Sequence, residues 1–339
     1  MAPTLRFRED GSFTVVQITD THYQNGEPRD LQTLDLLQSV VDAERPDLVV
    51  LTGDVIAGGA CLDPADSWRK LVAPLESRGQ LWMAVFGNHD DEGGATRADL
   101  MEVQREHPHC LSEPGPPNLP GVGNYVLPIA AGDGRLAAAL YGIDSLSYAP
   151  RAVEGYAWVT REQIGWYLGV AAALAPVHAE GRSAEEAVRA AREAALVPRS
   201  SPERSTLPAL AFMHIPLPEY DEVWDHRACR GSKHESVCCP KLNSGLFAAM
   251  VEAGDVMGVF VGHDHVNDFE GELHGVRLCY GRGSGYNTYG REGFPLGARV
   301  IRLREGHRGF ETWIRLHAGG IAPAPPEHAP KGRVLTEEG

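Results

Sequence analysis

The sequence lacks any long hydrophobic run: no stretch approaches the roughly 18 consecutive apolar residues of a membrane-spanning helix. The opening residues, MAPTLRFREDG, carry charges where a secretory signal peptide would have its apolar segment. Basic residues are also few, since 31 Lys and Arg stand against 46 Asp and Glu, a formal net charge of −15. We therefore expect a cytoplasmic protein that binds neither membranes nor nucleic acid. A small anionic substrate stays compatible with this charge, because a bound metal would reverse its sign locally.

Cysteine is sparse, with six residues in 339 and no C-x-x-C pair, which argues against a disulfide scaffold. We expect free thiols in a reducing compartment. Cys238 and Cys239 are adjacent and Cys229 is near them, so a local disulfide among these three is the alternative.

Internal repeats and clear linkers are absent too, so we predict one domain over residues 1–317. At 43% apolar residues, a chain of this length can bury a substantial core. Residues 178–205 contain a capping-box start, Ser183 with Glu186, and we expect a surface insertion there. Residues 318–339 are rich in Ala, Pro and Gly, and we expect a flexible tail.

Short apolar runs recur along the chain and are separated by helical or polar segments. The runs cover residues 13–18, 47–51, 80–86, 136–143, 207–213 and 256–262. Between the first two, leucines recur at helical spacing after Asp30, which could cap that helix. This alternation predicts an α/β protein with a layered sheet, and ligands of such sheets bind beyond the carboxyl ends of the strands.

Nearly every run ends in a side chain that could bind a metal. They are Asp20 and His22 in DTH, Asp54 in GD, Asn88 and His89 in GNHD, His214 in MHIP, and His263 and His265 in GHDH. Each motif alone is weak, because a single histidine after a strand is more often a surface or hydrogen-bonded residue. Together they offer enough imidazole and carboxylate ligands for two metal ions that share one carboxylate.

The ordered set D-x-H, GD, GNHD, a lone H and GHxH resembles the calcineurin-like metallophosphoesterase superfamily. The segments HIPLPEYDEVW and LCYGRGSGYNTYG are similar to a subgroup related to purple acid phosphatases, which includes plant and yeast proteins called "probable inactive". The resemblance implies a four-layer α/β fold of two packed mixed β-sheets flanked by helices. It implies that Asp20, His22 and His265 bind one metal, that Asn88, His214 and His263 bind the other, and that Asp54 bridges them.

The resemblance also implies an activity, the hydrolysis of phosphoric esters by a bridging hydroxide held between two Mn, Fe or Zn ions. His89 would be the general acid and not a ligand. We favour a small phosphomonoester as substrate; a phosphodiesterase and a catalytically silent metal-bound scaffold are the alternatives. The complete ligand set counts against the scaffold. The chain departs from true purple acid phosphatases at two positions. Those enzymes have a tyrosine ligand where this chain has Ala57, and their first motif is D-x-G, whereas here His22 takes the place of the glycine.

Further polar residues are weaker candidates. Asp90 could orient the imidazole of His89, and Asp264 could be a hydrogen-bond acceptor or a solvated loop residue. Substrate contacts are predicted for Asn88, Asp144, Tyr286 and Tyr289. An ordinary turn is the alternative for Asp144, and packing is the alternative for the tyrosines.

Overall fold

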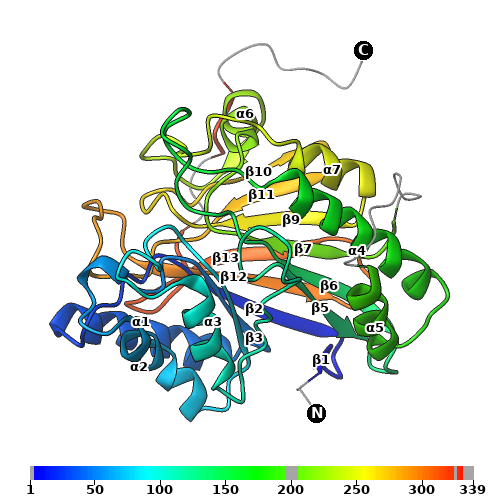
Figure 1. The fold of residues 1–339 in the computed structure, drawn as a ribbon, viewed down its shortest axis with the longest axis horizontal. Coiled ribbons are helices and arrows are strands. Elements are labelled where there is room, and N and C mark those ends of the chain that lie inside the picture. Colours follow the sequence, from blue (N-terminus) through cyan, green and yellow to red (C-terminus); the bar gives the residue numbers. More distant parts are fainter. Residues whose placement is uncertain (1–3, 195–204, 324–326, 331–339) are drawn as a thin grey trace.

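A computed structural model describes residues 4–194, 205–323 and 327–330. Its strands form two mixed sheets (Figure 1). The larger sheet has the order β1-β5-β6-β7-β9-β11-β10-β8, with β1 (Leu5–Arg6), β5 (Tyr125–Ala130), β6 (Leu136–Gly142), β7 (Ala209–Phe212), β8 (Cys229–Arg230), β9 (Val256–Val261), β10 (Glu270–Leu273) and β11 (Val276–Tyr280). The smaller has the order β13-β12-β2-β3-β4, with β2 (Ser12–Ile18), β3 (Leu48–Thr52), β4 (Trp82–Val85), β12 (Gly297–Arg304) and β13 (Phe310–Leu316).

Helices cover the outer face of each sheet. The smaller sheet carries α1 (Pro28–Glu44), α2 (Pro64–Ser77) and α3 (Arg97–Arg105), with a 3-10 turn, η1 (Gly58–Ala60), before α2. The larger sheet carries α4 (Arg161–Ala179), α5 (Ala184–Ala194), α6 (Glu219–His226) and α7 (Leu246–Ala253). Figure 1 shows α1, α2 and α3 gathered on one side of the molecule and α4, α5 and α7 on the other.

The strand β3 shows why its sequence is continuously apolar. Side chains alternate between the two faces of a strand. Val49 and Leu51 pack in the cluster that includes α1 and α2, whereas Leu48 and Val50 pack in the cluster between the two sheets. Both faces of β3 are therefore buried, and the burial of apolar surface on both faces stabilises the four-layer arrangement that the resemblance implied.

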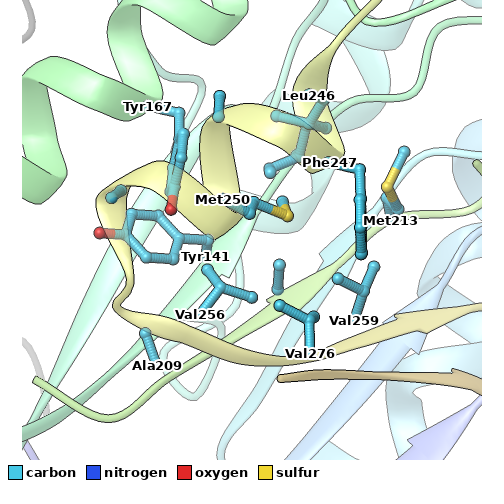
Figure 2. Packing of buried hydrophobic residues seen from close by; sticks show 14 of the residues in the cluster. Tyr141, Tyr167, Ala209, Met213, Leu246, Phe247, Met250, Val256, Val259 and Val276 are labelled. Atoms are coloured by element: carbon cyan, nitrogen blue, oxygen red, sulfur yellow. The ribbon is translucent and has the colours of Figure 1, made fainter. Parts of the chain in front are cut away.

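The outer face of the larger sheet is packed in the same way. Figure 2 shows Leu246 and Met250 of α7 against the strand that carries Val256 and Val259, with Tyr167 of α4 beside them. These side chains are at most 1% exposed. The helices hold the sheet from outside, so the sheet can present the ends of its strands as a rigid edge.

The strands that precede the predicted ligands run parallel to their neighbours. In the smaller sheet β2 pairs with β3 and β3 with β4; in the larger sheet β6 pairs with β7, and β7 with β9, all in parallel. Parallel neighbours end at the same edge of a sheet. In each sheet, the polar loops after these strands are thereby brought to one edge, and the ligand clusters described below show that the two edges adjoin.

Some local expectations need correction. The first helix begins at Pro28 with Glu27 as its N-cap, and Asp30 occupies the third helical position of a capping box. The described part of the expected insertion, through residue 194, includes α5, whose Ala187 and Ala191 are buried in the core cluster of the larger sheet. A stripe of small residues makes this close packing possible, while the charged face of α5 is exposed, so α5 is a surface helix and its origin as an insertion stays a prediction. The rest of the insertion, apart from residue 205, lies outside the described residues.

The expected tail also makes specific contacts where it is described. The ring of His328 stacks on Trp224 at a centroid distance of 3.8 Å, and its backbone pairs with Cys229. Residues 327–330 thus pack against α6 and the edge strand β8, and the flexibility expected of residues 318–339 stays a prediction. Of the helices that the structure describes, none has the length and apolar content to cross a membrane. The six cysteines all lie in described segments and are unpaired.

Candidate metal centre

Two clusters of potential metal ligands lie at the shared edge of the sheets. Asp20, His22, Asp54 and His265 form the first, and Asp54, His214 and His263 form the second. In each cluster the ligand atoms lie within 4.8 Å of one another. Asp54 belongs to both clusters, and all these residues are buried. The structure thus brings together all the Asp and His ligands that the sequence predicted.

Distances within the clusters show how closely the donors converge. Asp54 Oδ2 lies 3.2 Å from His214 Nε2 and 3.5 Å from His22 Nε2. His214 Nδ1 lies 2.8 Å from the carbonyl oxygen of Thr52. Because that carbonyl only accepts, it fixes the tautomer of His214 and leaves Nε2 for a ligand.

The backbone at the site is conformationally unusual. Asp20, His22, Asp54 and His263 have φ values of 54°, 44°, 47° and 78°. Residues other than glycine rarely adopt positive φ, and such conformations cluster at functional sites where the surrounding structure imposes them. The short turns after β2, β3 and β9 therefore hold the side chains in directions that a regular strand would not allow.

Glycines before the ligands make room for the neighbouring loop. A Cβ atom on Gly87 would lie 2.1 Å from Oδ1 of Asp54, and one on Gly53 would lie 2.5 Å from Nδ1 of His214. At Gly262, it would meet Thr19 Oγ1 at 2.0 Å. The glycines of GD, GN and GH are thus explained by the close approach of one ligand loop to the next.

The protonation states and orphan atoms fit metal ions. Burial lowers the pKa of His22 to about 4 and that of His263 to about 3, so both imidazoles are neutral at pH 7. Burial opposes ionisation of Asp20, but the histidines, chiefly His265, lower its pKa to about 2. Within the described residues, Asn88 Oδ1 and His22 Nε2 are buried and make no hydrogen bond. Burial also opposes protonation of His214 and His265, but the carboxylates of Asp54 and Asp20 outweigh it. They raise the pKa of His214 to about 9 and also raise that of His265, so a metal ion would compete with protons for these two imidazoles. Imidazole nitrogens, ionised carboxylates and a free amide oxygen form a donor set suited to transition-metal ions.

His89 lies beside this centre, on its solvent side. Its side chain is 40% exposed, and its ring centroid is 5.2 Å from that of His22. Its backbone N–H donates to Oδ1 of Asp54 over 2.8 Å. Its Nδ1 lies 2.7 Å from Oε2 of Glu92, a residue that sequence reasoning missed although it follows three positions later in GNHDDE.

Asp90 does not orient His89. It is fully buried, and its carboxylate accepts from the backbone N–H groups of Ile56 and Gly87. Adjacent side chains point apart here, so Asp90 holds the loop while Glu92 reaches the imidazole. Asp264 accepts hydrogen bonds from the Tyr280 hydroxyl and the backbone N–H of Cys238.

Asp144 lacks the exposed position that the predicted substrate contact would require, and it has a structural role. It is fully buried, and its carboxylate accepts from the side chain of Arg97 and the backbone N–H groups of Val122 and Leu146. Arg97 in turn donates to the carbonyl oxygen of Gly87 over 2.7 Å. This buried pair ties the loop after β6 to the GNHD loop, which no sequence pattern indicated.

The two predicted tyrosines lie on one side of the centre. The ring of Tyr289 stacks on His265 with centroids 4.2 Å apart, whereas Tyr286 bonds His317 through its hydroxyl over 2.6 Å. Both line a cavity of about 750 Å³, together with Arg291. Contact of Asn88, Tyr286 or Tyr289 with a substrate stays a prediction.

Comparisons with known proteins agree with this geometry. The calcineurin-like phosphoesterase family model matches residues 13–267. The chain is 36% identical to an Arabidopsis thaliana protein named "Probable inactive purple acid phosphatase 29", over 92% of this chain and 84% of that protein. It is 30% identical to "Phosphatase DCR2" of Saccharomyces cerevisiae, over 93% of this chain and 56% of that protein. A dimetal phosphatase from Danio rerio has a similar fold, with a TM-score of 0.53 at 14% identity over 88% of this chain and 98% of that chain. The chain therefore belongs to the calcineurin-like phosphoesterase family.

Proposed function

We propose that this protein is a metal-dependent phosphomonoesterase with a dinuclear centre. The observation that carries the proposal is the place of Asp54 in both ligand clusters, so that one carboxylate can contact two ions. When bound, such a pair of ions neutralises phosphoryl charge and makes a water molecule nucleophilic at neutral pH.

The residues divide into two groups around Asp54. Asp20, His22 and His265 would hold one ion, and Asn88, His214 and His263 the other. The orphan Oδ1 of Asn88 supports its place in the second group, because a buried amide oxygen without a partner is costly unless something else satisfies it.

His89 is proposed as the proton donor to the leaving group. It stands beside the ligand cluster and is open to solvent, so a bound ester could reach it. A positioned proton donor contributes about 10²- to 10⁴-fold to the rate of such a reaction. The net charge of −15 favours a small phosphorylated substrate over nucleic acid.

The test combines metal analysis with a substrate panel. Protein prepared without chelator should carry two transition-metal ions per chain and should hydrolyse nitrophenyl phosphate. It should hydrolyse bis-nitrophenyl phosphate more slowly. Faster turnover of the diester would replace the monoesterase with a phosphodiesterase. Two bound ions without turnover of either ester, with Mn, Fe and Zn each supplied, would refute the activity and favour a silent scaffold.

A further inference from the structure

A hydrogen-bond network through Glu92 and Tyr148 connects the side chain of His89 to that of Asn88, its neighbour in the chain. Nδ1 of His89 lies 2.7 Å from Oε2 of Glu92, and the Tyr148 hydroxyl donates to Oε1 of the same carboxylate over 2.7 Å. Nδ2 of Asn88 donates to that hydroxyl over 3.2 Å. Neither Glu92 nor Tyr148 belongs to the ligand clusters.

Counting donors determines the direction of each bond. Tyr148 has a single hydroxyl hydrogen, which it gives to Glu92, so it can only accept from Asn88. The amide of Asn88 must therefore turn its NH₂ group to Tyr148 and its Oδ1 the other way. A carboxylate only accepts, so Nδ1 of His89 carries a proton and Nε2 remains for the substrate.

Tyr148 is held in place by its own loop, which follows β6. Its ring stacks on Tyr156 with centroids 6.0 Å apart and planes inclined by 25°, and the two backbones form a bridge. Tyr156 in turn meets the ring of His263 edge-on at 4.4 Å. The preceding residue, Ser147, donates its hydroxyl to the backbone oxygen of Asn88 over 3.3 Å. The hydrogen-bond network is thus connected to the ligand cluster through Tyr156 and through Ser147.

We propose that Glu92 and Tyr148 are positioning residues that set the proton donor and one metal ligand together. Glu92 fixes the orientation and tautomer of His89, and Tyr148 fixes both Glu92 and the amide of Asn88. The proposal rests on the proposed phosphoesterase function, since it assigns His89 as the proton donor and Asn88 as a ligand.

The first arm compares two esters that differ in their need for a proton. Nitrophenolate leaves readily as an anion, whereas the alkoxide of 2-phenylethyl phosphate needs protonation. Loss of a partner behind a site residue commonly lowers activity about 10- to 100-fold. In metal-loaded enzyme, Glu92→Ala should lower kcat by that factor for the alkyl ester, by clearly less for the nitrophenyl ester, and should leave KM nearly unchanged.

The second arm asks whether Glu92 acts through His89. In the His89→Asn background, Glu92→Ala should cause little further loss, because the group it positions is gone. Glu92→Gln keeps an acceptor oxygen and should recover part of the rate. Glu154→Ala is the matched control, because this carboxylate is 77% exposed and pairs with Lys241. Its replacement should leave kcat unchanged for both esters.

The third arm reads metal binding and not turnover. Tyr148→Phe removes the acceptor of the Asn88 amide, so affinity for one of the two ions should fall about 10-fold in chelator competition. Glu92→Ala should retain both ions and the thermal stability of the wild type. If Glu92→Ala does not fold, Tyr148→Phe, which deletes one oxygen atom, decides the proposal through its metal affinity.

The possible results distinguish failure of the proposed phosphoesterase function from failure of the positioning role. A wild type that binds two ions but hydrolyses neither ester refutes the proposed function and this proposal with it. The positioning role alone is refuted if the wild type is active and Glu92→Ala lowers kcat equally for the two esters. It is also refuted if Glu92→Ala lowers kcat by the same factor in the His89→Asn background as in the wild type. Unchanged metal affinity in Tyr148→Phe refutes the link to Asn88.

Discussion

Gly87 is the position where the smallest change should do the most damage. A Cβ atom there would lie 2.1 Å from Oδ1 and 2.3 Å from the backbone nitrogen of Asp54, more than 1 Å inside ordinary contact. The backbone of Gly87 cannot retreat, because its N–H donates to Asp90 over 2.7 Å and its carbonyl oxygen accepts from Arg97 over 2.7 Å. Gly87→Ala must therefore move Asp54, the carboxylate common to both clusters.

The magnitude follows from that displacement. Forcing one extra methyl group into a packed site costs about 1–3 kcal/mol, and with a backbone atom as obstacle we expect about 3 kcal/mol. A shift of about 1 Å in a positioned group lowers turnover about 10²-fold. Denaturant unfolding of the metal-free protein measures the first effect, and metal content with nitrophenyl phosphate turnover measures the second.

A matched substitution isolates the steric cause. Gly165 lies inside α4, and a methyl group added there would meet no atom of the described residues within 4 Å beyond its own stretch of helix. Gly165→Ala should therefore stabilise the helix by up to about 1 kcal/mol. The reasoning is refuted if Gly87→Ala unfolds within about 0.5 kcal/mol of the wild type, the scatter of harmless substitutions, and still binds two ions.

Further expectations concern the shared ligand, the buried ion pair and a buried carboxyl. Asp54→Asn should lower the content of both ions by elemental analysis, and full retention of two ions would overturn its bridging place. Arg97→Ala leaves the carboxylate of Asp144 buried without its cation and should lower the free energy of unfolding by about 3–5 kcal/mol, the usual result of breaking a buried pair; a loss below about 1 kcal/mol in denaturant would contradict this. Burial raises the pKa of Asp255 above 3.8 although two tyrosine hydroxyls donate to it. Its folded form therefore holds its proton more tightly than its unfolded form, so the contribution of Asp255 to stability is full below pH 3.8 and falls as the pH rises through the folded pKa. In urea titrations, the free energy of unfolding of the wild type minus that of Asp255→Asn should therefore decrease as the pH rises above 3.8. An increase of this difference with pH would contradict the raised pKa of Asp255. Iron-loaded protein should lack the strong visible band of a tyrosinate–iron bond, since Ala57 stands at the tyrosine position implied by the resemblance; such a band would show that another tyrosine binds iron.

The chain alone determined the elements and the pattern of the ligands. Apolar runs such as 47–51 predicted buried strands because strands covered on both faces need apolar residues at every position. The polar residues directly after those runs predicted one edge of a sheet as the site, because parallel strands end together. Local spacing was sufficient for both inferences, and the order of the motifs identified the family.

Tertiary structure alone decided which side chains support the site. Asp90 is next to His89 in sequence but buried away from it, whereas Glu92 reaches the imidazole. Tyr148 meets Asn88 from sixty residues away. The pairing of Arg97 with Asp144 depends likewise on how one loop packs on another. Such contacts arise from the packing of two sheets and their loops, and no periodicity in the chain encodes them.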